Sequence, residues 1–384
     1  MKSNFISRFL LISILFNLSF QKFLEPEKEP LLLATDDCKD KTFSATEKNV
    51  KITGRFYQNE DTTWLVQSGS SIEFYLSGQK TGLILVGDQS IYSGPDFRPR
   101  FAVYVNDELL LDSTMNELEL NVDLFKGQTD KRIKVKVMLL SENSNGGIGV
   151  KSINTYICSN SYPIEPVEKK KLKIEFLGDS ITCAYGVEGK DQNENFKTTT
   201  ENSSKSYAYL ASQMLDADYS IVCYSGAGII SGYSNGEKNT GNLFPPHYEK
   251  ASRNSKYPGE WDFEGNRNDV VFINLGTNDK NYVTAQPSTR NDEFIQEYVK
   301  FLTAVRKDNP DSYIICTLGT LGCEEIYKLV EQAVQLFGDK KVSYFLSPSQ
   351  NMNTDGIGSD WHPSAITHQK LSKLVAEKIN AVLK

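Results

Sequence analysis

The chain has 384 residues, of which 39% are hydrophobic and 24% are charged, proportions that are ordinary for globular proteins. This length allows one to three domains and a core that needs neither metal nor a disulfide scaffold. The formal net charge is −7, which argues against nucleic acid or an anionic membrane as a main partner, because both attract basic surfaces.

The N-terminal segment is predicted to be a targeting sequence. Residues 1–20 are typical of a signal peptide, because the basic residues Lys2 and Arg8 precede an apolar run at 9–20. This run of roughly a dozen residues is too short for a membrane span of about 20. A signal anchor is the alternative, and Leu33-Ala34-Thr35 is one candidate cleavage site. Residues 21–37 are expected to be a linker. We therefore expect a secreted, extracellular protein whose mature chain does not insert into a membrane.

Six cysteines are present, an even number that permits disulfide bonds in a secreted chain but does not give their connectivity. Cys38 and Cys158 bracket the first predicted domain, and Cys316 and Cys323 are close enough in sequence to close a small loop. Buried free thiols are the alternative, since cysteine is commonly buried. The sequence has no C-x-x-C pair and only three histidines, so we predict no structural metal site.

Residues 38–160 are predicted to fold as a β-sandwich of the jelly-roll kind. Short alternating segments follow one another, and Gly, Asn and Asp separate them. In residues 132–138, for example, apolar Ile133, Val135 and Val137 alternate with lysines, which is the mark of a strand with one buried face. Other such segments are 49–56, 71–76 and 100–105.

A linker at 161–171, with two prolines and a lysine run, is expected before a second domain at 172–384. This domain alternates continuous apolar runs with amphipathic segments, which predicts an α/β fold with a parallel five-stranded sheet. The expected strands are 172–177, 219–224, 270–275, 313–318 and 342–346, and the expected helices are 206–215, 293–307, 324–337 and 365–383. Because ligands bind beyond the carboxyl ends of such strands, catalytic residues should follow the strands.

Residues that suit acyl transfer follow three of these strands. Ser180 comes just after the first, where its hydroxyl can act as a nucleophile, although a helix-capping serine is the alternative. Gly226 follows the second and can bring its backbone N–H close to a ligand. Asn278 follows the third, and its side-chain amide can donate to an oxyanion. Plain turn residues are the alternative for both.

A nucleophilic serine needs a base, and only His247, His362 and His368 could supply an imidazole. His368 lies inside a predicted helix and His247 lies in a loop between elements, whereas His362 follows the last predicted strand. We therefore predict His362 as the base. Asp360 is expected to accept the Nδ1 proton of this histidine and fix its tautomer. A backbone carbonyl that orients the ring is the alternative.

The blocks Gly178-Asp179-Ser180, Gly226, Gly276-Thr277-Asn278-Asp279 and Asp360-Trp361-His362 resemble the motifs of SGNH/GDSL hydrolases. Within that superfamily the chain resembles carbohydrate esterase family 2, of the acetyl xylan esterase type, over nearly everything after Asp37. The usual spacing in the superfamily is Asp-x-x-His, whereas Asp-Trp-His is expected in family 2.

The resemblance implies a two-domain fold, in which a jelly roll precedes an SGNH hydrolase domain, and it implies roles for the site residues. Ser180 would be the nucleophile and His362 the base, with Asp360 completing a triad or dispensable in a dyad. The N–H groups of Ser180 and Gly226 and the side chain of Asn278 would form the oxyanion hole. Trp361 would line the sugar site. No cofactor and no metal are expected for this chemistry.

We therefore predict a secreted serine esterase that hydrolyses acetyl esters on acetylated xylan or glucomannan. Its expected partner is a polysaccharide or oligosaccharide substrate, not nucleic acid. An SGNH lipase or lysophospholipase and a catalytically inactive carbohydrate-binding protein are the alternatives. Residues 232–236 match the G-x-S-x-G nucleophile pattern, but this pattern needs a strand before it and a helix after it, so we do not expect Ser234 to react.

Overall fold

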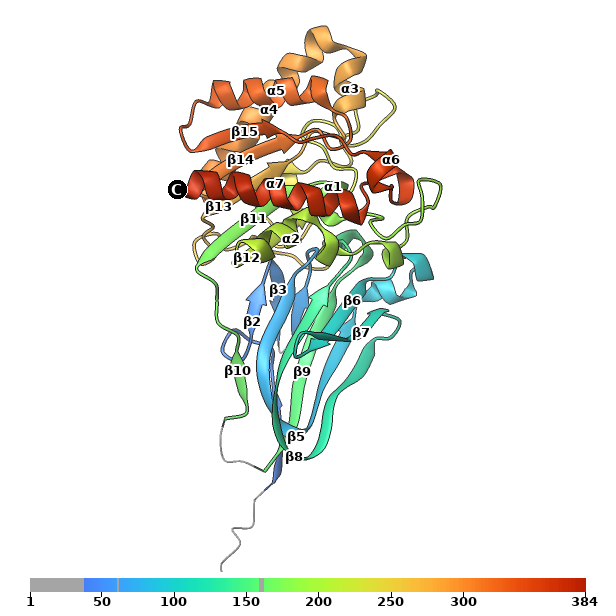
Figure 1. Ribbon diagram of the computed structural model, residues 1–384, viewed down its shortest axis with the longest axis vertical. Coiled ribbons are helices and arrows are strands. Elements are labelled where there is room, and N and C mark those ends of the chain that lie inside the picture. Colours follow the sequence, from blue (N-terminus) through green and yellow to red (C-terminus); the bar gives the residue numbers. More distant parts are fainter. Residues whose placement is uncertain (1–37, 61, 159–161) are drawn as a thin grey trace, which may run out of the picture. The chain divides into compact units, whose positions relative to one another are not determined.

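The computed structural model describes residues 38–60, 62–158 and 162–384 (Figure 1). The predicted signal peptide at 1–20 and the predicted linker at 21–37 lie outside the described residues. Along the described chain an antiparallel sheet comes first, and a parallel sheet with helices follows it. This order confirms the predicted fold class.

Ten antiparallel strands form the N-terminal part, which we call the β-sandwich domain. Their order is β3-β4-β9-β5-β8-β6-β7, with β1 paired to β9, and with β2 and β10 paired to β5. They are β1 (Lys39–Phe43), β2 (Lys51–Thr53), β3 (Phe56–Asn59), β4 (Thr62–Leu65), β5 (Ser71–Gly87), β6 (Arg100–Val105), β7 (Glu108–Thr114), β8 (Glu119–Leu139), β9 (Ile148–Ile157) and β10 (Ile164–Pro166). The last of these lies in the segment that the sequence analysis assigned to a linker.

The two longest strands, β5 and β8, pair along most of their length and curl around one hydrophobic core (Figure 1). Phe74 and Leu83 come from opposite halves of β5, yet both are buried in that core. Register shifts next to Gly78 and Gly82 make this possible, because a β-bulge bends a strand. Glycines that were expected to separate short strands therefore lie inside long ones, and these strands are longer than predicted.

The C-terminal part, which we call the α/β domain, holds five parallel strands in the order β12-β11-β13-β14-β15. They are β11 (Leu172–Gly178), β12 (Ala217–Cys223), β13 (Val270–Asn274), β14 (Tyr313–Leu318) and β15 (Val342–Leu346). Successive side chains of a strand point to opposite faces of the sheet. In β13, accordingly, Phe272 packs in one core, and Val271 and Ile273 pack in the other.

Helices cover both faces of this sheet (Figure 1). One core includes residues of α2 (Tyr207–Met214) and α7 (Ala365–Leu383), and the other includes residues of α4 (Pro287–Asp308) and α5 (Glu324–Phe337). The short helices are α1 (Ser180–Cys183), α3 (Lys280–Ala285) and α6 (Met352–Asp355). Of the helices in the described part of the chain, none has both the length and the apolar character that crossing a bilayer requires.

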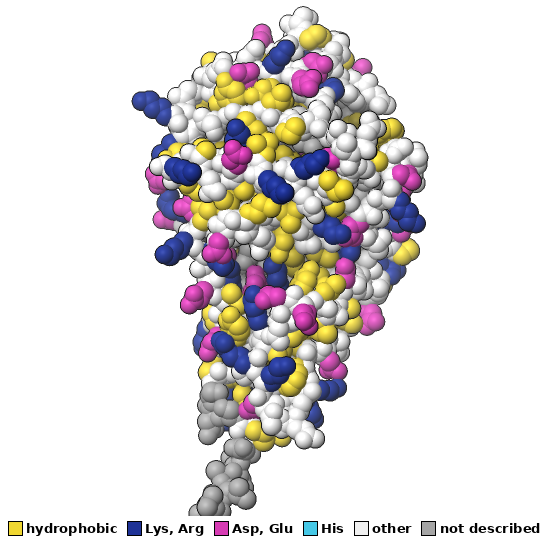
Figure 2. Space-filling model, viewed as in Figure 1, with side chains coloured by type: hydrophobic (Ala, Val, Ile, Leu, Met, Phe, Trp, Pro, Cys, Tyr) yellow, Lys and Arg dark blue, Asp and Glu magenta, His cyan; other side chains and the backbone are white. Residues whose placement is uncertain are grey.

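A buried ion pair joins the two domains. Nε of Arg55, between β2 and β3, lies 3.1 Å from Oε1 of Glu175 on β11, and both side chains are fully buried. Arg55 also donates to the backbone carbonyls of Tyr248 and Lys250. Because an unpaired buried charge is costly, these contacts fix the β-sandwich domain on the α/β domain. On the face shown in Figure 2, acidic and basic side chains are interspersed.

The cysteines take a pairing that sequence left open. Cys38 bonds to Cys158 and thereby closes the β-sandwich domain, and a second disulfide joins Cys183 to Cys223. Cys316 and Cys323 are buried free thiols and do not close the loop considered above. Cys316 points from β14 into the core beside α4 and α5. Burial raises the pKa of Cys316 to about 12 and that of Cys323 to about 11, so both remain protonated thiols.

Candidate active site

Ser180 is the first residue of α1, two positions after the last residue of β11. The preceding residue, Asp179, caps this helix, because its carboxylate accepts the N–H of Ile181 at 3.0 Å. Ser180 is therefore not the helix-capping serine of the alternative interpretation. The first N–H groups of a helix have no acceptor within the helix, so the Ser180 N–H can meet a ligand.

His362 meets Ser180 across 182 positions of sequence. Nε2 of His362 lies 2.8 Å from Oγ of Ser180, and Nδ1 lies 3.0 Å from the backbone carbonyl oxygen of Asp360. Because a carbonyl oxygen only accepts, Nδ1 carries the proton and Nε2 accepts from the serine hydroxyl. Burial lowers the pKa of His362, although the backbone carbonyls of Asp360 and Ser359 oppose this. The lowered pKa favours the neutral imidazole, which can take a proton.

The carboxylate of Asp360 does not take the place that the sequence analysis gave it. Its Oδ2 accepts from the Tyr185 hydroxyl and from the Phe196 N–H, each at 2.9 Å. The backbone explains this orientation: Asp360 and Trp361 both adopt left-handed conformations, with φ of 49° and 66°. Such a turn is strained for residues with a side chain. It presents the Asp360 carbonyl to the imidazole and turns the carboxylate away.

Two aromatic residues at this turn were not predicted as site residues. The centroid of the Tyr185 ring lies 4.2 Å from that of the His362 ring. The Phe196 ring stacks on Tyr185, with 4.3 Å between the centroids. Burial, followed by the hydrogen bond to Asp360, raises the pKa of Tyr185 well above its usual value, so the phenol stays a donor. Tyr185 thus links the imidazole to the Asp360 carboxylate. The only signal in the sequence was its position five residues after Ser180.

The three predicted oxyanion donors lie at one edge of the sheet. Gly178, Cys223 and Asn274 are register partners at the carboxyl ends of β11, β12 and β13. Ser180, Gly226 and Asn278 follow these three strand ends in turn. Gly226 has a φ of 74°, a conformation that favours glycine. The Asn278 amide nitrogen donates to the Ala227 carbonyl at 2.9 Å, which leaves its second N–H available.

Buried aspartates hold the loops that carry these donors. The Asp279 carboxylate accepts the N–H groups of Ile229, Ile230 and Ser231 at 2.8–3.0 Å. Burial raises the pKa of Asp279 to about 6, in spite of these bonds, and raises that of Asp179 to about 7. The aspartate of the Gly-x-Asn-Asp block, Asp279, therefore organises the loop after Gly226 and does not contact the Ser180–His362 pair.

The remaining sequence candidates differ in exposure and in hydrogen bonding. Trp361 is 55% exposed next to His362, as a side chain that meets a ligand would be. His368 is buried in α7, where Nδ1 accepts the Tyr207 N–H at 3.1 Å. His247 lies in a short 3₁₀ turn. Ser234 lies in a loop, where its hydroxyl accepts the Gly236 N–H at 3.3 Å.

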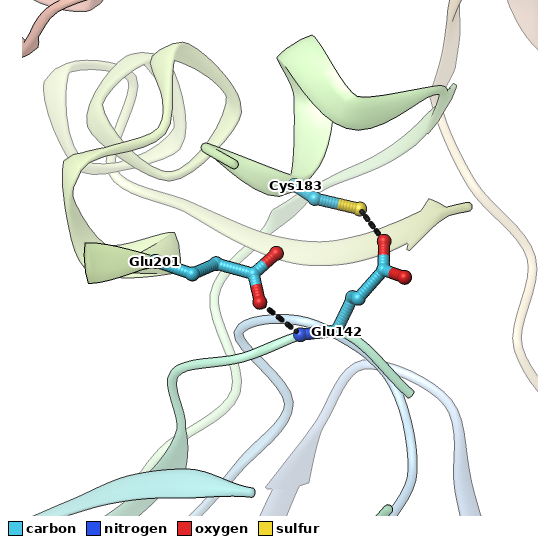
Figure 3. Close-up of side chains that lie close together, drawn as sticks. All are labelled: Glu142, Cys183 and Glu201. Atoms are coloured by element: carbon cyan, nitrogen blue, oxygen red, sulfur yellow. Dashed lines mark hydrogen bonds between the residues drawn. The ribbon is translucent and has the colours of Figure 1, made fainter. Parts of the chain in front are cut away.

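One buried group of side chains offers atoms of the kinds that bind metals. Glu142, Cys183 and Glu201 place a carboxylate oxygen or sulfur within 4.8 Å of one another (Figure 3). Cys183 is bonded to Cys223, however, and a thiolate is the form of cysteine that binds metals. This group therefore supplies two carboxyl groups and a disulfide sulfur, which is a poor ligand set for a cation.

Comparisons with known proteins show the family to which this chain belongs. The model of the GDSL-like lipase/acylhydrolase family matches residues 176–370, more than half of the chain. The cellulase/esterase CelE of Acetivibrio thermocellus is 36% identical over 228 residues, which are 57% of this chain and 26% of CelE. The chain thus spans about a quarter of that relative. An acetylxylan esterase/glucomannan deacetylase of Cellvibrio japonicus is 23% identical over 89% of this chain and 91% of its own.

A solved structure extends the likeness to both domains. A family two carbohydrate esterase from Clostridium thermocellum, in complex with cellohexaose, superposes with a TM-score of 0.75 at 27% identity. The match covers 87% of this chain and 99% of that one. These relatives support the predicted class, a carboxylic ester hydrolase. The structural neighbours are family two carbohydrate esterases, as the sequence predicted. The family model spans the strand-end loops that carry Ser180 and His362. The chain therefore belongs to the GDSL-like lipase/acylhydrolase family.

Proposed function

We propose that this protein is a secreted serine esterase that removes acetyl groups from plant-type polysaccharide, such as acetylated xylan or glucomannan. The observation that carries the proposal is the 2.8 Å contact between Ser180 Oγ and His362 Nε2, with Nδ1 held by a carbonyl. A serine activated by an oriented base is the arrangement that covalent acyl transfer requires.

The reaction proceeds in two steps. His362 takes the Ser180 proton on Nε2 while Oγ attacks the acetyl carbonyl carbon, and the resulting oxyanion accepts hydrogen bonds from the three proposed donors. The C–O bond to the sugar then breaks, and the sugar oxygen takes the proton from Nε2. In the second step water attacks the acetyl-Ser180 ester, with His362 again as the base. Acetate leaves and Ser180 regains its proton.

The site works as a dyad of Ser180 and His362. The Asp360 carbonyl fixes the tautomer, as a triad carboxylate would, but it brings no full negative charge to the imidazolium that forms. The Asp360 carboxylate instead anchors the turn through Tyr185 and Phe196. Asp360 is thus a positioning residue in this proposal.

A carbohydrate substrate is favoured by the exposed Trp361 beside the base, since an aromatic face suits the apolar face of a sugar ring. The names of the relatives point the same way: one is an acetylxylan esterase/glucomannan deacetylase, and a structural neighbour was solved with cellohexaose.

Secretion is favoured by the two disulfides, Cys38–Cys158 and Cys183–Cys223. Disulfides persist in oxidising compartments and are rare in the cytosol. The predicted signal peptide would direct the chain there.

Acetate release from acetylated xylan and acetylated glucomannan tests the proposal. Wild type should release acetate from at least one of them, and Ser180→Ala should lower turnover by about 10⁴ or more while keeping the melting temperature, because the nucleophile is lost. Preferential cleavage of long-chain aryl esters would point to a lipase instead. Binding of the polysaccharide without acetate release would point to an inactive carbohydrate-binding protein.

A further inference from the structure

A side chain from the β-sandwich domain reaches the loop that carries Gly226. Glu142 follows β8, and its Oε2 accepts the Ser225 N–H at 2.9 Å, one residue before Gly226. Ser225 lies in no helix or strand, so this contact is not part of a regular ladder. Glu142 itself is buried, with 5% of its surface exposed.

The segment that carries Glu142 is fixed to the α/β domain on both sides. Before it, the Leu140 carbonyl accepts the Ser203 N–H at 2.9 Å. After it, the Asn143 side chain accepts the Ser252 hydroxyl at 2.7 Å. A carboxylate on a segment tied at both ends has little freedom to move, so it can define the position of the peptide that it binds.

The surroundings of Glu142 hold its carboxylate in one orientation. Oε1 accepts the Ser144 hydroxyl, and Glu201 Oε2 accepts the Glu142 N–H at 3.0 Å. Burial, followed by the Glu142 charge, raises the pKa of Glu201 well above its usual value, which favours the neutral acid there. The pair therefore avoids two buried like charges side by side.

The same cluster touches the helix of the nucleophile. Cys183, the last residue of α1, has its sulfur 3.3 Å from Glu142 Oε2, and its bond to Cys223 ties α1 to the end of β12. As a disulfide sulfur it has no proton to donate, so this is a packing contact. Glu142 thus contacts both α1, which carries Ser180, and the loop after β12 that carries Gly226, which we call the oxyanion loop.

We propose that Glu142 is a positioning residue for the oxyanion hole: by accepting the Ser225 N–H, it holds the Gly226 peptide in the place that the transition state requires. The inference rests on the proposed esterase function. It makes the β-sandwich domain a working part of the active site, because it supplies an acceptor that the α/β domain does not.

Substitutions that separate the acceptor from the charge test this role, with p-nitrophenyl acetate as the substrate. Glu142→Gln keeps a carbonyl oxygen at the same reach and should retain kcat within about threefold. Glu142→Ala removes the acceptor, and Glu142→Asp withdraws it by one methylene. Both should lower kcat by about tenfold to a hundredfold with little change in KM, less than the loss of a whole oxyanion donor.

Ser252→Ala is the matched control, since it breaks a contact of the same segment that does not involve the oxyanion loop. It should lower the melting temperature but keep kcat within about threefold, because the tie from Leu140 to Ser203 and the Glu142–Ser225 hydrogen bond remain. Equal kcat losses for Glu142→Gln and Glu142→Asp, or an unchanged kcat in Glu142→Asp, would overturn the proposal. Should Glu142→Ala fail to fold, the Gln and Asp variants still decide. A wild type without esterase activity would refute the proposed function itself.

Discussion

Two regions approach one site from different domains. One is the set of loops at the carboxyl ends of the parallel strands, and the other is the segment after β8. Their polar groups differ in how many hydrogen bonds they make within the protein. Within the described residues, the Gly226 N–H has no protein acceptor, and Asn278 uses one of its two N–H groups. Both carboxylate oxygens of Glu142, by contrast, accept hydrogen bonds. The groups proposed to meet the substrate keep a free N–H, whereas the carboxylate proposed to position them has both oxygens bonded. This contrast separates reacting from supporting residues.

The largest expected effect comes from a comparison of His362 and His368 in the C-terminal region. His362→Ala should lower kcat by about 10⁴ or more, because the base is lost. His368 is already engaged with the Tyr207 N–H, so His368→Ala should cost about 1–3 kcal/mol of stability with little change in kcat. Steady-state kinetics and denaturant unfolding of both variants provide the measurement. Similar kcat losses in both would remove the special role of His362.

The second test concerns the free amide of Asn278. Asn278→Ala should lower kcat by about 10²–10³ with a small change in KM, because the lost donor acts mainly on the developing oxyanion. Kinetics on p-nitrophenyl acetate give both parameters. A change confined to KM would instead assign Asn278 to substrate binding.

The third test uses Asp360, whose carboxylate accepts two hydrogen bonds through Oδ2 and none from the imidazole of His362. Asp360→Asn keeps an acceptor for Tyr185 and Phe196 and leaves the backbone carbonyl in place, so kcat should fall about tenfold or less. The loss of a working triad carboxylate would lower kcat by a factor on the order of 10⁴. The decisive measurement is the plateau of the pH profile of kcat/KM for wild type and variant.

The same profiles contain a prediction about His362. Since burial lowers its pKa, and the base must be neutral to act, wild-type activity should persist below the ordinary histidine pKa of about 6.5. Asp360→Asn should shift this acid limb only slightly to lower pH, because the Asp360 charge is a minor contribution. A large shift together with a collapsed plateau would restore the triad.

The smallest expected effect belongs to Glu201, behind the site. Its pKa is raised by burial, so its contribution to stability is present below the unfolded pKa of about 4.5 and is lost as pH rises through the folded pKa. Glu201→Gln imitates the neutral acid. Its free energy of unfolding relative to wild type should therefore grow from about pH 4.5 upwards, by at most about 1.4 kcal/mol per pH unit. A constant difference between pH 4 and pH 8 would contradict a raised pKa.

Sequence patterns predicted the elements that local order determines. The apolar runs of β13 and β14 and the amphipathic pattern of α5 placed these elements to within a residue of their observed bounds. Because strand ends of a parallel sheet meet at one edge, Ser180 and His362 could also be brought together. The bulges of β5 could not be read, since a glycine in a bulge looks like one in a turn.

What sequence could not give depends on backbone conformation and on contacts between domains. The Asp360 carboxylate turns away from the imidazole because Asp360 and Trp361 both adopt positive φ. An Asp-Trp pair in a sequence does not predict this conformation. Glu142 and Tyr185 reach the site through tertiary contacts. The Cys183–Cys223 bond likewise depends on the neighbouring places of α1 and β12.

Covalent labelling by a serine-reactive fluorophosphonate identifies the nucleophile of this protein. The Ser180–His362 contact predicts a single modification on the peptide that contains Ser180, with labelling abolished in Ser180→Ala and strongly slowed in His362→Ala. Peptide mass spectrometry locates the adduct. Modification of Ser234, or an unlabelled wild-type protein that still releases acetate, would contradict the assignment of Ser180 as the nucleophile.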